Sequence, residues 1–263
     1  MAIPYPNIPP TLIKIGPLAL HWYGLAYIIG IIGGYIIIQK KLSSQLPLNN
    51  DQKMNFILYI SIGILLGGRL GYILFYNASY YLKNPFEIVA LWQGGMAFHG
   101  GILGAIVAMI LFSKHNKGKV WAYLDLIALV APLGIGLGRI CNFINGELYG
   151  RVTTLPWGMV FPTGGPLPRH PSQLYEAVLE GLILGLCLYR YSKTPHHIQH
   201  PGNLACLFAL LYSSFRFIIE FVREPDPQLG LLYLNLSMGQ WLCIGLASIS
   251  LISFYLQNRI KKR

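Results

Sequence analysis

Long runs of apolar residues dominate this chain, and short polar segments separate them. Each of seven runs reaches the roughly 18 residues that a helix needs to cross the hydrocarbon of a bilayer. The seven runs are 18–38, 54–76, 96–113, 120–137, 173–190, 204–222 and 237–257. The pattern predicts an all-α polytopic membrane protein with a bundle of about seven transmembrane helices, because a helix satisfies its own backbone in lipid.

Two of the polar connections differ from the rest. Residues 77–93 are rich in Tyr, Phe and Trp, which is typical of an arm lying in the headgroup layer. Residues 139–171 are rich in glycine and proline and predict a small extracytoplasmic cap. We expect residues 1–263 to form one integral-membrane domain that includes both segments.

Composition supports a membrane protein and excludes several other classes. The chain is 54% hydrophobic and only 11% charged, which does not suit a water-soluble domain. Its net charge of +11 indicates membrane topology and attraction to anionic lipid, because no basic–aromatic pattern for nucleic acid is present. The four cysteines have neither zinc spacing nor a paired disulfide framework.

The distribution of Lys and Arg predicts the orientation. Twelve lie on one side of the predicted spans: Lys40, Lys41, Lys53, Lys114, Lys117, Lys119, Arg190, Lys193, Arg259, Lys261, Lys262 and Arg263. Six lie on the other side: Lys14, Lys83, Arg139, Arg151, Arg169 and Arg223. The positive-inside rule then places the N-terminus outside and the C-terminus in the cytoplasm.

Glycines recur at four-residue spacing within several spans. The sets are Gly30/Gly34, Gly63/Gly67/Gly71, Gly134/Gly138 and Gly181/Gly185. This small-xxx-small spacing favours close packing between helices.

The segment 138–151 (GRICNFINGELYGR) is the most polar stretch beside a predicted span. Charged groups at bilayer depth cost at least about 2.5–3.5 kcal/mol, so they usually serve a site. Arg139 and Asn142 share one face if the segment is helical, and with Asn145, Glu147 and Gly150 they suit an anionic ligand. The alternative is a juxtamembrane loop whose arginines snorkel to the interface.

Polar residues also stand out at the start of two other spans. Tyr23 follows His21 and Trp22, where it belongs either to an interfacial aromatic belt or to a site. His99 lies between two glycine pairs, Gly94-Gly95 and Gly100-Gly101, which open the backbone around an imidazole.

Arg216, Glu220 and Arg223 share one stripe of the sixth predicted helix. The stripe is either an ion-pair ladder or a site in which Glu220 orients the arginines, and the two interpretations are compatible. At the start of the fifth span, Ser172 is a candidate N-cap, and Gln173, Glu176 and Glu180 fall on one face. Spacing and topology together predict an outer-leaflet cavity lined by Arg139, Arg216, several amides and one histidine, which suits a phospholipid phosphate.

The sequence resembles the bacterial phosphatidylglycerol–prolipoprotein diacylglyceryl transferases almost from end to end. The motifs that carry the resemblance are HWYG at 21–24, GGRLGY at 67–72, FHGG at 98–101, GRxxNFxNGExxGR at 138–151, RHPSQLYE at 169–176 and FRxxxExxRxPD at 215–226. Cys141 departs from the family pattern, which usually has Gly or Ala there. The cap between Arg151 and Arg169 is also short.

The resemblance implies an enzyme of the bacterial plasma (inner) membrane, with its active site toward the outer leaflet. The diacylglyceryl group of phosphatidylglycerol would move to the lipobox cysteine of a preprolipoprotein signal peptide, forming a thioether and releasing glycerol phosphate. No metal or organic cofactor is implied.

In that chemistry we expect His99 to be the base that ionises the acceptor thiol. Arg139 and Arg216 would grip the phosphate and stabilise charge as it leaves, and Tyr23 would donate to a phosphate or glyceryl oxygen. The residues expected to shape the headgroup pocket are Arg139, Asn142, Asn145, Glu147, Gly150, Glu220 and Arg223.

The rival class is a non-enzymatic membrane protein, either an anionic-lipid flippase or a small anion transporter. Such a protein needs a polar path through both leaflets. In this chain the charges within the membrane gather toward the outer half, and Asp125 and Arg69 are the main exceptions.

Overall fold

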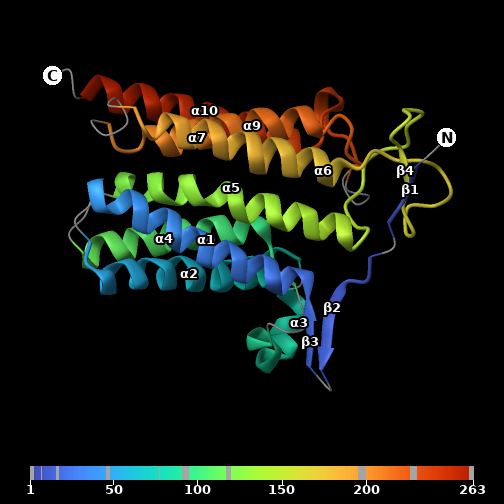
Figure 1. Cartoon of the computed structure of the whole chain (residues 1–263), viewed down its shortest axis with the longest axis horizontal. Helices are drawn as coiled ribbons and strands as arrows, with labels where there is room; N and C mark the ends of the chain where they lie inside the picture. The colour runs from blue at the N-terminus through green and yellow to red at the C-terminus, as the bar shows by residue number, and fades with distance from the viewer. Residues whose placement is uncertain are drawn as a thin grey trace. The chain divides into compact units, whose positions relative to one another are not determined.

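The computed structural model describes residues 3–6, 8–15, 18–45, 48–76, 78–90, 95–116, 120–194, 200–225 and 230–260. These residues are mostly helical (Figure 1). They form two compact units, one of Met1–Ile37 with Asp125–Arg263 and the other of Ile38–Leu124.

The first unit carries most of the long helices and all of the short strands. Its helices are α1 (Trp22–Gln45, as far as Ile37), α5 (Val120–Ile144, from Asp125), α6 (Ser172–Glu176), the π-helix η3 (Ala177–Ile183), α7 (Leu184–Tyr191), α9 (Asn203–Ile219), the 3-10 turn η4 (Tyr233–Asn235) and α10 (Met238–Ile260). Its strands form two pairs, parallel β1 (Ile3–Pro4) with β4 (Met159–Val160), and antiparallel β2 (Thr11–Ile15) with β3 (Leu18–His21).

Helices of the first unit pack around a core of large apolar side chains. The buried residues of this core are Leu129, Leu184, Leu188, Leu204 and Tyr212. At the crossing of α5 and η3, a Cβ on Gly181 would lie only 2.7 Å from the Cα of Gly136, so only glycine permits this approach. On the other side of α5, Gly33 and Gly34 of α1 face Leu133 and Val130.

The second unit consists of α2 (Asn50–Tyr76), α3 (Ala78–Lys83), the 3-10 helix η1 (Pro85–Val89) and α4 (Phe98–His115). The helices α2 and α4 pack along much of their length, and Gly63, Gly67 and Gly71 face the glycines of α4. A Cβ on Gly104 would lie 2.0 Å from the carbonyl oxygen of Gly63. Glycine spacing thus predicted this interface correctly. It was wrong for Gly134 and Gly138, where a Cβ would meet nothing within 4 Å.

Arg69 shows why a charge is tolerated inside the apolar helix α2. Its side chain is 3% exposed and donates from Nη2 to the carbonyl of Glu87 at 2.6 Å and from Nε to that of Ile88 at 2.9 Å. Its guanidinium also lies 5.0 Å from the ring centroid of Tyr81. Arg69 therefore satisfies the carbonyls at the end of η1 and holds the α3–η1 segment against α2.

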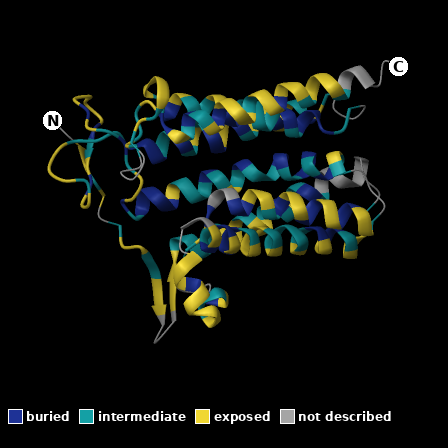
Figure 2. Cartoon of the chain, turned by 180° about the vertical axis from the view of Figure 1, so that it is seen from behind, coloured by how far each residue is buried: buried dark blue, intermediate teal, exposed yellow. Residues whose placement is uncertain are grey.

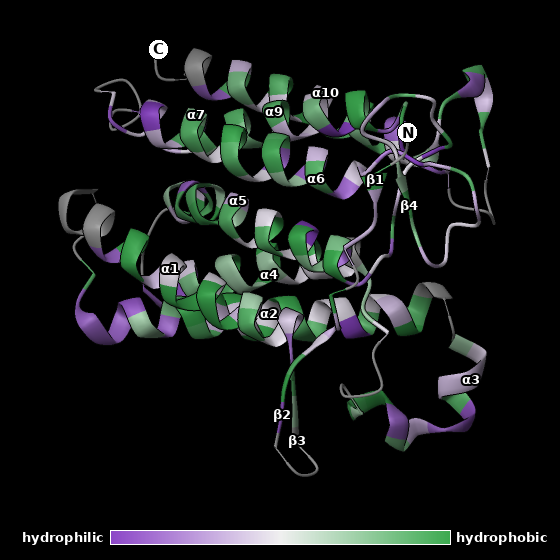
Figure 3. Cartoon of the chain, turned by 45° about the vertical axis from the view of Figure 1, so that its right-hand side comes forward, coloured by the Kyte–Doolittle hydropathy of each residue, from purple (hydrophilic) through white to green (hydrophobic). Residues whose placement is uncertain are grey.

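The helices expose apolar side chains along their outer faces, as expected for a multi-pass membrane protein (Figures 2 and 3). Within the described residues, the helices long and apolar enough to cross a membrane are four: Trp22–Gln39, Asn50–Leu74, Val120–Ile144 and Met238–Gln257. The other predicted spans, 96–113, 173–190 and 204–222, correspond to α4, to the α6–η3–α7 segment and to α9. The apolar helices at α4 and α9 are shorter than the four long ones. The π-helix η3 interrupts the α6–η3–α7 segment.

One boundary differs from the sequence prediction. The fourth span was expected to end at Leu137, with the cap beginning at Arg139, but α5 continues to Ile144. Arg139 and Asn142 lie on the additional turns and contact Glu176 and Glu147, and these contacts stabilise the turns. Arg139 and Asn142 therefore lie on a helix, and irregular backbone begins after Ile144.

Candidate active site

Three arginines and three glutamates form one buried cluster in the first unit. The arginines are Arg139 on α5, and Arg216 and Arg223 on and just after α9; the glutamates are Glu176 on α6, Glu180 on η3 and Glu220 at the end of α9. The arginine side chains are 13–15% exposed and the glutamate side chains only 0–6%. The arginines therefore keep some accessible surface, and the carboxylates lie behind them.

Glu176 is the carboxylate that all three arginines share. Its Oε2 lies 3.2 Å from Nε of Arg139, and its Oε1 contacts Nη1 of Arg216 and lies 3.4 Å from Nη1 of Arg223. A carboxylate can accept several donors at once, so this residue fixes the relative positions of the guanidinium groups.

Glu180 is held more loosely. Its Oε2 lies 3.4 Å from Nη2 of Arg139, and its Oε1 lies 3.8 Å from Nη1 of Arg216. The π-helix η3 has wider turns than an α-helix and brings this carboxylate to the same side as Glu176. Turns of this kind are frequent at functional sites.

Glu220 completes the stripe predicted on the sixth helix. Its Oε1 lies 2.6 Å from Nη2 of Arg216, four residues earlier, and its Oε2 accepts a hydrogen bond from Ser237 Oγ at 2.8 Å. Gly239 leaves room for this carboxyl, because a Cβ there would lie 2.9 Å from it. The ion-pair ladder is confirmed, and it also orients Arg216.

A second polar cluster surrounds the carboxylate of Glu147. Its Oε1 accepts hydrogen bonds from the Tyr23 hydroxyl at 2.7 Å, from Asn142 Nδ2 at 3.1 Å and from Asn145 Nδ2 at 3.3 Å. Asn142 Nδ2 also contacts the Tyr23 hydroxyl. The structure thus brings Tyr23 to three residues of the 138–151 segment that the sequence analysis had grouped.

The turn that carries Glu147 is tied to the start of α6. Gln173 Nε2 donates to the Glu147 carbonyl at 2.6 Å, and Ser172 Oγ donates to the Leu148 carbonyl at 3.0 Å. These bonds hold Leu148 at φ 58°, a conformation that costs a non-glycine residue about 1–2 kcal/mol. The prediction that Ser172 is an N-cap was wrong: its hydroxyl bonds this turn, and Pro171 occupies the cap position.

Gly150 has a packing role that needs no ligand. A Cβ there would lie 2.4 Å from the carbonyl oxygen of Val222 and 2.7 Å from Cβ of His170. Its N–H donates to the His170 carbonyl at 2.8 Å, and the N–H of Arg151 donates to the Val222 carbonyl at 2.8 Å. This close approach ties the segment that carries Arg223 to the 138–151 segment.

Of the basic cap residues around Gly150, Arg151 lies beside the cluster, because its Nε donates to the Arg223 carbonyl at 2.9 Å. His170 and Arg169 add little further positive charge. Burial lowers the pKa of His170, which favours the neutral imidazole near pH 7. Arg169 is engaged elsewhere, because its Nη1 lies 2.9 Å from Glu224 and its Nε donates to the Gly164 carbonyl at 2.8 Å.

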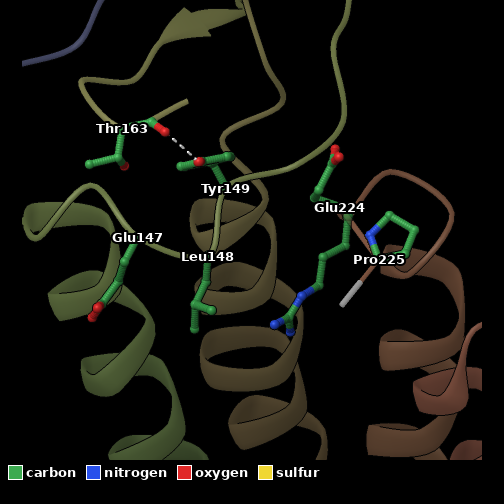
Figure 4. A pocket seen from close by; sticks show the side chains of 7 residues that line it. Glu147, Leu148, Tyr149, Thr163, Glu224 and Pro225 are labelled. Atoms are coloured by element: carbon green, nitrogen blue, oxygen red, sulfur yellow. Dashed lines mark hydrogen bonds between the residues drawn. The ribbon is translucent and has the colours of Figure 1, made fainter. Parts of the chain in front are cut away.

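A cavity of about 260 Å³ is lined by one member of each polar cluster, Glu147 and Arg223 (Figure 4). It is lined by Glu147, Leu148, Tyr149, Thr163, Arg223, Glu224 and Pro225. The hydroxyl of Tyr149 donates to the carbonyl of Thr163 at 2.8 Å and closes one wall. Glu147 and Arg223, which belong to different polar clusters, therefore line the same cavity.

His99 lies in the first turn of α4, in the second unit. Its side chain is outside the part of the chain that the structure describes, so its role as a base stays a prediction. Cys141 is 4% exposed on α5.

The sequence analysis did not assign a site role to Glu176 or Glu180. The available signal was their shared helix face with Gln173, which is a common feature of ordinary helices. Among the described residues, no group of three or more His, Cys, Asp or Glu side chains is arranged to hold a metal ion. Glu176, Glu180 and Glu220 are paired with arginines.

The fold and the site define a helical, multi-pass membrane protein with a buried arginine cluster suited to a phosphorylated ligand. The chain belongs to the prolipoprotein diacylglyceryl transferase family, whose sequence model matches residues 10–256. A relative from Brucella anthropi is 47% identical over 98% of this chain and 95% of its own length. One from Brucella canis is 46% identical over 100% of this chain and 96% of its own length. Both relatives are named phosphatidylglycerol–prolipoprotein diacylglyceryl transferase.

Proposed function

We propose that this chain transfers the diacylglyceryl group of phosphatidylglycerol to the cysteine thiol of a lipobox in a preprolipoprotein signal peptide. The sulfur forms a thioether bond to the glyceryl carbon, the bond from that carbon to the phosphate oxygen breaks, and glycerol phosphate leaves. Family membership gives the transferase activity. The observation that supports the site is the convergence of Arg139, Arg216 and Arg223 on shared carboxylates.

The arginines are proposed to bind the phosphate through their accessible sides. A guanidinium offers two parallel N–H donors to a phosphate, which an ammonium group cannot copy. Glu176 and Glu220 hold Arg139, Arg216 and Arg223 in place before the lipid arrives, so little reorganisation is needed when charge develops on the leaving oxygen.

The cluster around Glu147 is proposed to recognise the glycerol part of the headgroup. Tyr23, Asn142 and Asn145 all donate to its carboxylate, and the other carboxylate oxygen is available to accept from a hydroxyl. The adjoining cavity reaches from Glu147 to Arg223, which would let one headgroup contact both clusters.

His99 is proposed to take the proton from the acceptor thiol. A free thiol has a pKa near 8.5, so its ionisation at pH 7 costs about 2 kcal/mol and benefits from a base. Direct attack by this thiol is simpler than a covalent route through Cys141, because the acceptor already supplies the nucleophile.

The chain is proposed to act as one integral-membrane domain with seven crossings in the bacterial plasma (inner) membrane. The N-terminus is placed outside, the C-terminus in the cytoplasm and the site toward the outer leaflet, on the basis of the Lys and Arg distribution. Residues 139–171 would form the cap. Residues 77–93 would form the interfacial arm, since Leu82 and Phe86 are 83% and 92% exposed.

The test is a transfer reaction with purified protein, phosphatidylglycerol and a synthetic lipobox peptide. Mass spectrometry should find the diacylglyceryl mass on the cysteine, and a peptide with Ser in place of that cysteine should gain nothing. Lipid movement between leaflets without any peptide product would favour the flippase alternative and contradict the proposal.

A further inference from the structure

The arginine–glutamate cluster is electrically balanced without a lipid. Three guanidinium groups face three carboxylates, so their formal charges cancel. A phosphodiester brings one more negative charge to the arginines. Buried charge without compensation is costly. Arg151 is a further cation beside the cluster, because its Nε donates to the Arg223 carbonyl at 2.9 Å, but no ion pair joins it to Glu176, Glu180 or Glu220 among the described residues. The loss of one carboxylate charge would compensate the phosphodiester within the cluster itself.

Glu180 is the carboxylate most easily neutralised. Its side chain is 0% exposed, and its ion-pair distances, 3.4 and 3.8 Å, are longer than the closest contacts of Glu176 and Glu220. Its Oε1 is buried without a hydrogen-bond partner among the described residues. Oε2 of Glu176 also lacks a hydrogen bond, but it lies 3.2 Å from Nε of Arg139, whereas Oε1 of Glu180 lies 3.8 Å from its nearest guanidinium nitrogen among the described residues. A buried oxygen far from any donor is costly to keep ionised, so the distances favour Glu180 as the group that takes up a proton.

Glu176 and Glu220 have closer donors than Glu180. Glu176 contacts all three arginines, and Glu220 accepts both Arg216 and the Ser237 hydroxyl. The titratable and charged groups that act on Glu180 are Arg139 on α5, Glu176 on α6, Tyr212 and Arg216 on α9, and Cys243 on α10. Glu220 and Arg223 belong to the same ion-pair network through Arg216 and Glu176. Arginine, tyrosine and cysteine side chains already carry their protons near neutral pH. The residues of this set that can take up a further proton are therefore the glutamates.

The geometry points to a proton-coupled binding step: Glu180 takes up one proton when the phosphodiester of the lipid binds the arginines, and loses it when the product leaves. This inference rests on the proposed function, since it concerns the same site and the same donor lipid. Glu180 acts through the arginines and the charge balance, so it is a positioning residue and not a catalytic one.

Proton uptake has a defined sign in a binding experiment. If the complex holds one more proton than the free protein and free lipid, affinity rises as pH falls. Over the pH range in which uptake is complete, the Kd should increase about tenfold for each unit of pH. A site without coupled uptake should show a flat profile.

The experiment titrates the full-length protein in detergent with dihexanoyl phosphatidylglycerol, whose phosphodiester does not titrate near neutrality. Calorimetry in HEPES and in Tris, which have different ionisation enthalpies, gives the number of protons taken up. The wild type should take up close to one. Glu180→Gln should bind with a flat pH profile and no uptake, and Glu180→Asp should keep the uptake. Glu87→Gln, which removes a carboxylate outside the cluster, is the matched control and should behave as wild type.

The outcomes separate this inference from the proposed function. Saturable binding by the wild type without proton uptake would overturn the inference and leave the lipid donor intact. Uptake that persists in Glu180→Gln would assign the proton to another group and also overturn it. No saturable binding by the wild type would count against phosphatidylglycerol as donor and against both proposals. The wild-type measurement decides the coupling even if Glu180→Gln fails to fold.

Discussion

Individual side chains of the site depend on partners that lie far away in the sequence. Arg139 and Glu176 are 37 positions apart, and Arg216 reaches the same carboxylate from another helix. Each arginine is thus oriented before any ligand binds. The planar fork of arginine matters here because it can contact a carboxylate on one side and a phosphate on the other.

Replacing these arginines by lysine tests the planar contact. Arg139→Lys and Arg216→Lys keep the charge but lose the fork, so each should reduce kcat/KM by at least about tenfold, or about 1.4 kcal/mol. The measurement is the rate of peptide lipidation at varied lipid concentration. Wild-type rates in both variants would show that electrostatic attraction alone suffices.

His99→Gln tests the proposed base. Glutamine has a similar size but cannot take a proton at neutral pH, so transfer should fall by about 10²–10⁴-fold while binding of dihexanoyl phosphatidylglycerol is retained. Single-turnover lipidation and calorimetric binding measure the two effects separately. Near-normal turnover would remove His99 from the mechanism.

Gly150→Ala tests whether this glycine is required by packing. The new Cβ would meet backbone atoms of Val222 and His170 that cannot move independently, so we expect a loss of about 1–3 kcal/mol in the free energy of unfolding. The loss should appear as a lower Tm in detergent even without substrate. An unchanged Tm with lost activity would instead favour direct contact between Gly150 and the ligand.

Pairs of helices are held at close range by glycine contacts. The α2–α4 interface relies on backbone-to-backbone packing at Gly63, Gly67 and Gly104, and α5 meets η3 at Gly136 and Gly181. Lipid gives no hydrophobic advantage to helix association, so such close contacts supply much of the stability. Arg69 adds hydrogen bonds at the end of the same interface.

Gly104→Ala should separate α2 from α4, because its Cβ would lie 2.0 Å from the Gly63 carbonyl oxygen. Gly134→Ala is the matched control in an apolar helix, since nothing lies within 4 Å of its Cβ position. The first substitution should lower the Tm in detergent, and the second should leave it unchanged or raise it slightly. Equal effects would mean that helix propensity, and not contact distance, decides the result.

At the scale of the whole molecule, the distribution of charge predicts the orientation in the membrane. Twelve Lys and Arg residues on one predicted side against six on the other favour a cytoplasmic C-terminus, because basic segments resist translocation. This distribution also agrees with an odd number of crossings and an external N-terminus.

A reporter fused after Arg263 tests this topology. A fluorescent reporter that folds only in the cytoplasm should be active there, and an alkaline phosphatase fused at the same place should be inactive. The opposite result would indicate an even number of crossings. In that case the segment 96–113 would be the one expected not to cross the membrane, since the apolar helix there is shorter than the four long ones.

The sequence by itself determined the membrane-protein class, the long apolar helices, the family and most polar residues of the site. Hydrophobic run length and helical spacing are local properties, so they can be read along the chain. The Arg216–Glu220 pair was predictable for the same reason, because its members are four residues apart on one helix.

Only the tertiary structure decided which distant groups meet. Glu176 and Glu180 became arginine partners because α6 and η3 bring them to the arginines of α5 and α9. Arg69 found its acceptors in the carbonyls of η1. Tyr23, Asn142 and Asn145 met at Glu147 through a turn pinned by Ser172 and Gln173. Spacing along one helix cannot specify such contacts, because they depend on how separate helices approach and on which buried polar groups still need a partner.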